Sequence, residues 1–207
     1  MLFVIALLGA CSALAPARAR AWTDTTVTQV SASLDTTQPT TRVQLAVSVH
    51  VTGGWITRFE MTGLDEDFTL APDAPPVFET PAGERFVPEA MRGKEAGALD
   101  LVFADRHAAP HRGDYVLRLV YTTDAPLRAA THLDARTLRL RWRLPTWSVS
   151  LANVHVDIVA PHGTRPAADG GIDDALGDAS VTPLDAARTQ IALLRAHLPR
   201  GQVLEVA

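Results

Sequence analysis

The feature that most constrains the fold is a run of alternating apolar and polar residues in the first quarter of the chain. Every second residue from 43 to 51 is valine or leucine, and the residues between them are Gln44, Ala46, Ser48 and His50. Successive side chains of a β-strand point to opposite faces, so this pattern predicts a strand with one buried face. A Gly-Gly pair follows at 53–54 and indicates a turn.

The same period of two recurs after residue 22. We predict strands over residues 26–34, 43–51, 99–103, 113–123, 136–144 and, in two halves, 147–160. Residues 189–198 fit helical and strand spacing alike; we favour a terminal hairpin with 202–206, across a turn at 198–201. Many short strands without a long helical pattern predict an all-β fold, an antiparallel β-sandwich of immunoglobulin-like or jelly-roll-like type.

Residues 63–97 interrupt the regular strands with five prolines and four glycines. Proline has no N–H to donate to a neighbouring strand, so the short apolar pieces here predict edge strands and loops. We therefore assign residues 22–207 to one β-sandwich domain that carries a Pro/Gly-rich excursion at 63–97. The chain stops inside an apparent strand, which predicts that it is the front of a longer protein.

The first 21 residues have the features of a signal peptide. Residues 2–15 are almost wholly apolar but fall short of the roughly 20 residues that span a bilayer. Small residues at Ala19 and Ala21 suit cleavage before Trp22. A lipoprotein signal, with lipidation of Cys11 after Leu8-Gly9-Ala10, is the first alternative, and an uncleaved anchor is the second. All three predict an extracytoplasmic location, in the periplasm or at the cell surface.

Composition narrows the function. The formal net charge is -4, which argues against nucleic acid as a partner because phosphate binding needs clustered excess of Lys and Arg. Cys11 is the single cysteine, so an intrachain disulfide is excluded. Membrane association would come through lipidation of Cys11 or through a C-terminal segment beyond residue 207.

Catalytic and metal-binding motifs are weak. No G-x-S-x-G motif is present, and the cysteine lies in the leader. His107 and His111 have the spacing of metal ligands but flank Pro110 in a connection, while His155 and Asp157 share one face of a strand. The acidic loop 169–174 lacks the ligand order of an EF-hand. We predict no catalytic residue, no bound metal and no cofactor.

The segment RTLRLRWRLPTW, residues 136–147, offers the best candidate binding surface. Arg139, Arg141 and Arg143 alternate with apolar residues, so they share one strand face at intervals of roughly 7 Å. Such guanidinium groups suit acidic glycans, anionic lipid headgroups or an acidic protein. The simpler interpretation is a solvated face paired with acids such as Asp157. Trp147 is the candidate for stacking against a sugar, whereas Trp142 has the parity of a core residue.

The second half of the chain resembles the N-terminal extracytoplasmic domain of a family of predicted bacterial membrane proteins of unknown function. The residues that carry this resemblance are Gly113, Tyr115, Tyr121, Trp142, Leu144, Pro145, Trp147, Asn153, Val154, Val156 and Pro161. It implies an extracytoplasmic β-sandwich and no particular activity.

These observations favour an exported, non-catalytic β-sandwich module of the cell envelope with a binding or structural role. Its partner would be an envelope protein or a glycan. Two alternatives stay open: an enzyme that acts on envelope glycans or peptides, and a carbohydrate-binding module.

Overall fold

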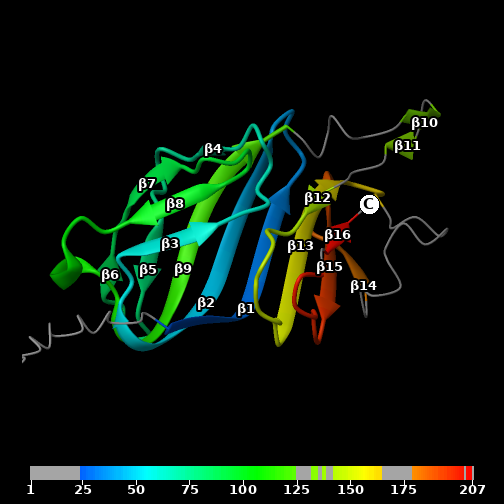
Figure 1. Ribbon diagram of the computed structural model, residues 1–207. Coiled ribbons are helices and arrows are strands. Elements are labelled where there is room, and N and C mark those ends of the chain that lie inside the picture. Colours follow the sequence, from blue (N-terminus) through cyan, green and yellow to red (C-terminus); the bar gives the residue numbers. More distant parts are fainter. Residues whose placement is uncertain are drawn as a thin grey trace, which may run out of the picture.

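The computed structural model describes residues 24–124, 132–134, 137–138, 142–164, 179–202 and 204–206. Its largest element is a nine-stranded sheet in the order β14-β15-β13-β1-β2-β9-β5-β6, with β4 also paired to β9 (Figure 1). The strands are β1 (Asp24–Asp35), β2 (Thr41–Trp55), β4 (Thr69–Leu70), β5 (Val77–Glu79), β6 (Arg85–Phe86), β9 (His111–Thr123), β13 (Asn153–Pro161), β14 (Ala179–Pro183) and β15 (Arg188–Arg195). All neighbours are antiparallel except β1 and β13, which are parallel.

A second, smaller layer lies across one face of this sheet (Figure 1). It contains a three-stranded sheet in the order β3-β8-β7 and the strand pair β12–β16. The bounds are β3 (Arg58–Met61), β7 (Glu89–Arg92), β8 (Leu99–Val102), β12 (Trp142–Arg143) and β16 (Glu205–Val206). The remaining elements are the strand pair β10 (His132–Asp134) and β11 (Thr137–Leu138) and the 3₁₀ turn η1 (Arg106–Ala108).

The core between the two layers explains the alternation in the sequence. The apolar residues of β2 and β9 face the smaller layer, and Val47 and Leu117, which are 0% exposed, are partners in register. A fully buried aliphatic side chain stabilises a fold by about 1.5–3 kcal/mol relative to an exposed one. The prediction of an all-β, antiparallel-dominated sandwich is confirmed.

The excursion at 63–97 builds strands at the edges. β6 ends one side of the large sheet and β7 ends one side of the small sheet, as the prolines predict. The predicted terminal hairpin is wrong: β15 pairs with β13 and β14, whereas β16 pairs with β12. Leu198 bridges to Leu151, so the chain crosses to the smaller layer there.

The described part of the chain contains no helix that is long and apolar enough to cross a membrane.

Candidate functional site

The face of the large sheet that points away from the smaller layer is called the outer face here. Its side chains alternate with the buried ones, and they are partly or fully exposed. In the middle of the central strands β1 and β2 several of them are small, namely Ser31, Ser33, Ala46 and Ser48, and longer side chains such as Gln29, Arg42 and Gln44 flank them. The residue pairs Ser31–Ala46 and Ser31–His155 are in register across three strands. The outer face therefore extends over several strands and carries hydroxyl, amide and charged side chains.

One histidine–carboxylate pair lies at an end of this face. His50 on β2 and Asp114 on β9 are cross-strand partners, with 2.6 Å between His50 Nδ1 and Asp114 Oδ1. The two side chains are 46% and 72% exposed, so solvent weakens the interaction. Ser48 lies two residues from His50 along β2, and no hydrogen bond joins their side chains in the described part of the chain. These residues do not form a Ser-His-Asp relay.

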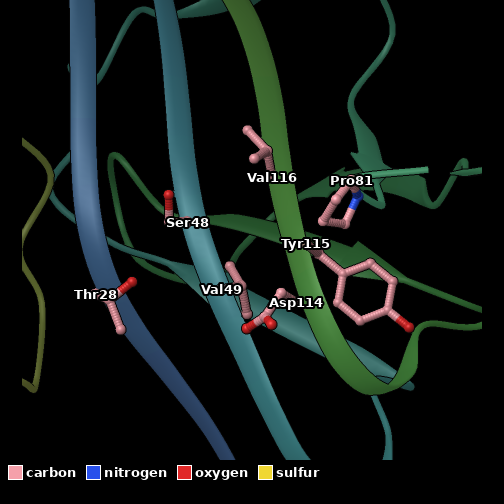
Figure 2. Close-up of a pocket in the computed structure, with 7 residues that line it drawn as sticks. All are labelled: Thr28, Ser48, Val49, Pro81, Asp114, Tyr115 and Val116. Carbon is pink, nitrogen blue, oxygen red and sulfur yellow. The ribbon is translucent and has the colours of Figure 1, made fainter. Parts of the chain in front are cut away.

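A small pocket of about 120 Å³ opens beside this pair (Figure 2). Thr28, Ser48 and Asp114 line it from three adjacent strands. Val49, Pro81, Tyr115 and Val116 complete the lining. Its polar groups are hydroxyls and a carboxylate, which suit hydrogen-bond recognition, but its volume is below that of ordinary small-molecule sites.

A second histidine–carboxylate pair lies toward the other side of the outer face, on β13. His155 Nε2 is 3.5 Å from Asp157 Oδ1, and Gln190 of β15 donates to the same oxygen at 2.7 Å. Asp157 is 27% exposed and His155 is 43% exposed. The two pairs border the small central side chains on both sides, an arrangement that depends on strand register.

The arginine segment is described only in part. Arg139 and Arg141 lie outside the described residues, as does Cys11. Arg143 is exposed on β12, next to β16 in the smaller layer. The binding roles of the three arginines and the lipidation of Cys11 stay predictions.

Both tryptophans of this segment lie in the core. Trp142 is 1% exposed, as its parity predicts, and Trp147 is 7% exposed. The Trp147 ring lies against Phe59 with 6.4 Å between ring centroids. Stacking of Trp147 against a sugar, which stays a prediction, would require the ring to leave the core.

The histidines that resembled metal ligands have other partners. Asp105 Oδ1 accepts a hydrogen bond from the backbone N–H of His107 at 2.8 Å, and Arg106 Nε is 3.3 Å from His107 Nε2. Arg106 also lies over the Trp55 ring at 5.7 Å. Within the described ranges, no group of three His, Cys, Asp or Glu side chains could hold a metal. The acidic loop 169–174 lies outside those ranges.

A buried polar cluster joins the excursion to β9, and sequence reasoning did not single it out. Thr123 Oγ1 donates to Asp67 Oδ1 at 2.9 Å. Burial raises the pKa of Asp65, and the neighbouring carboxylate of Asp67 adds to that rise. Burial also raises the pKa of Tyr121, which is 0% exposed. The closely spaced acids at 65–67 are the feature of the sequence that could have pointed to this cluster. Their proximity to β9 is visible only in the folded structure.

Comparison with known proteins gives a result for the fold. No family model and no curated protein matches this sequence. Among solved structures, an M1 zinc metallopeptidase variant from Deinococcus radiodurans aligns with TM-score 0.55 and 13% identity, over 87% of this chain and 41% of that chain. A candidate protease from Parabacteroides distasonis aligns with TM-score 0.53 and 11% identity, over 87% and 40%.

The likeness is one of fold. At these identities the alignments assign this chain to neither family. The chain spans about two fifths of the length of both structures.

Proposed function

We propose that this chain is an exported, non-catalytic β-sandwich module of the cell envelope that binds a protein partner through its outer face. The observation that carries the proposal is the form of that face. It extends over several strands, and the pocket described on it, at about 120 Å³, is smaller than ordinary small-molecule sites. A surface of this shape suits a protein better than a small ligand.

The side chains of the outer face support this proposal. Ser31, Ser33 and Ala46 are short, so a partner can approach the sheet closely. Short side chains lose little rotamer entropy on binding, which lowers the free-energy cost of association. The pairs His50–Asp114 and His155–Asp157 supply hydrogen-bonding groups on both sides.

Site-specific photo-crosslinking in the producing cell tests the face. A photoreactive residue replaces Ala46 on the outer face or, as the matched control, Ala96, which is exposed in the turn between β7 and β8. We expect a discrete protein adduct from position 46 only. A photoreactive residue at Ser33 should lose the same adduct when Ala46→Arg is added and keep it when Ala96→Arg is added. Equal adducts from both positions, or an adduct insensitive to Ala46→Arg, would refute the proposal.

The export part of the proposal rests on the leader sequence. Mass spectrometry of the mature protein should give Trp22 as the first residue. A lipidated N-terminus at Cys11 would support the lipoprotein alternative, and an intact Met1 in the cytosolic fraction would contradict export.

The fold likeness favours a second candidate, in which this chain forms part of a peptide-acting enzyme. The aligned structures are peptidase chains of more than twice the aligned length. Under this candidate the purified full-length protein cleaves peptide substrates, and its activity is lost on treatment with a chelator. Under the first proposal, it cleaves none of a mixed peptide library.

A further inference from the structure

Among the residues that the structure describes, the large sheet ends at β14 with an exposed, uncharged strand. All five residues of β14 are exposed, and none of them carries a charge. Six large hydrophobic side chains of the described residues are exposed, and three of them lie at this end of the sheet: Val181, Leu184 and Leu194. Native proteins usually protect edge strands with charges, prolines, bulges or coverage, because a free edge is a template for another strand; of these devices β14 carries a proline, Pro183, at its C-terminal end.

The hydrogen-bond pattern of β14 shows which groups face the edge. Leu184 N–H donates to the carbonyl of Arg188 at 3.1 Å, and these residues continue the register of β14 with β15. Bonding to β15 alternates along an antiparallel strand, so Ser180 and Thr182 direct their N–H and C=O groups to β15. Ala179, Val181 and Pro183 therefore direct theirs to the opposite edge. Proline at such a position costs no hydrogen bond within the sheet.

We propose that β14 pairs antiparallel with β14 of a second copy of this chain, about a two-fold axis at Val181. In that register Val181 faces its counterpart, Ala179 faces Pro183 and Ser180 faces Thr182. Apolar residues thus meet apolar residues and hydroxyls meet hydroxyls, which are the pairings that stabilise adjacent strands. This self-complementarity favours a second copy over an unrelated strand, and a two-fold contact closes after one pairing.

Four edge hydrogen bonds form across the axis: two between the Val181 residues and two from Ala179 N–H to the opposite Pro183 carbonyl. Val181 shares the core-side face with its register partner Ile191, which is buried. The paired valines therefore extend the apolar core across the axis. One short strand pair is smaller than a standard interface, so we expect a dissociation constant between about 10⁻⁵ and 10⁻³ M.

Sedimentation of the full chain over a range of concentrations tests the pairing. We expect a monomer–dimer equilibrium that Val181→Lys abolishes, because it places two ammonium groups in contact. Val87→Lys is the matched control, since Val87 is 58% exposed in the excursion, outside β14. An unchanged melting temperature shows that both variants fold. A chain that stays monomeric up to about 1 mM, or a dimer that survives Val181→Lys, overturns the proposal.

Charge complementation and hydrogen exchange test the axis itself. Mixing Val181→Lys with Val181→Glu should restore dimers that neither variant forms alone. The amides of Ala179 and Val181 should become protected as concentration rises, whereas those of Ser180 and Thr182 should be protected already in the monomer. If mixing restores nothing, or if all four amides respond alike to concentration, the proposed register is wrong.

Discussion

The turn at Gly97, between β7 and β8, provides a direct test of its packing against the segment that follows β3. Gly97 has φ +71°, in the left-handed region, and a Cβ at this position would lie 2.1 Å from the backbone oxygen of Leu64. The backbone N–H of Leu64 donates to the Gly97 carbonyl at 3.0 Å. Gly97→Ala therefore imposes backbone strain and also displaces a backbone segment that cannot rotate away.

The magnitude follows from these two effects. The left-handed conformation costs alanine about 1–2 kcal/mol relative to glycine. Disturbing a buried backbone hydrogen bond adds about 1–3 kcal/mol. We expect Gly97→Ala to lower the free energy of unfolding by about 2–5 kcal/mol.

Gly201→Ala is the matched control. Gly201 has φ +69°, nearly the same conformation, but a Cβ there meets no atom within 4 Å. Gly201→Ala should lower the free energy of unfolding only by the cost of the left-handed conformation, about 1–2 kcal/mol. Urea denaturation, monitored by tryptophan fluorescence, gives the free energy of unfolding of both variants, which are compared if their m-values are equal. If the two variants lose the same free energy to within about 0.5 kcal/mol, the contact with Leu64 does not constrain this turn.

Three further substitutions test the core and its polar cluster. Burial raises the pKa of Asp65, so the Asp65 carboxyl binds a proton more tightly in the folded state than in the unfolded state. The stability that this group contributes therefore falls as pH rises from about 4 through the raised pKa. Asp65→Asn should remove that fall, measured by urea denaturation across this pH range; an unchanged pH slope would contradict it. Tyr121→Phe should change stability by less than about 1 kcal/mol, because the buried Tyr121 hydroxyl has no hydrogen-bond partner of good geometry among the described residues; calorimetry showing a loss above about 2 kcal/mol would reveal a bond. Leu119→Ala should cost about 2–5 kcal/mol in the same assay, since Leu119 is 0% exposed, and a loss below about 1 kcal/mol would place it outside the core.

Strand positions were predictable wherever one face is buried and the other is exposed. β1, β2 and β9 extend the predicted ranges by a few residues, because alternation fades where their ends leave the core. The pairing of strands was less accessible. β1 lies parallel to β13, with Gln29 beside Asn153, and no local pattern indicates a partner so distant in sequence. The prediction of a terminal hairpin was wrong for the same reason, since the predicted turn at 198–201 does not determine which strand pairs with the residues that follow it.

The candidate site was harder to predict than the fold. Alternation drew attention to the arginines of residues 136–147, because large charged side chains stand out between apolar ones. The outer face has the opposite character, with Ser31, Ser33 and Ala46 too ordinary to stand out. The His50–Asp114 pair exists only because β2 and β9 pair in one register, and a shift of one residue would send the two side chains to opposite faces.

The residues that carry the family resemblance clarify where function should be sought. Tyr115, Tyr121, Trp142, Trp147 and Val156 are all at most 7% exposed. A pattern made of such residues records how the two layers pack, and packing alone constrains it. These buried residues therefore relate to the fold, whereas Asn153 and Pro161 of the same pattern are exposed. The proposed binding surface is the outer face, so Ala46→Arg should weaken binding of the proposed partner while the melting temperature stays unchanged.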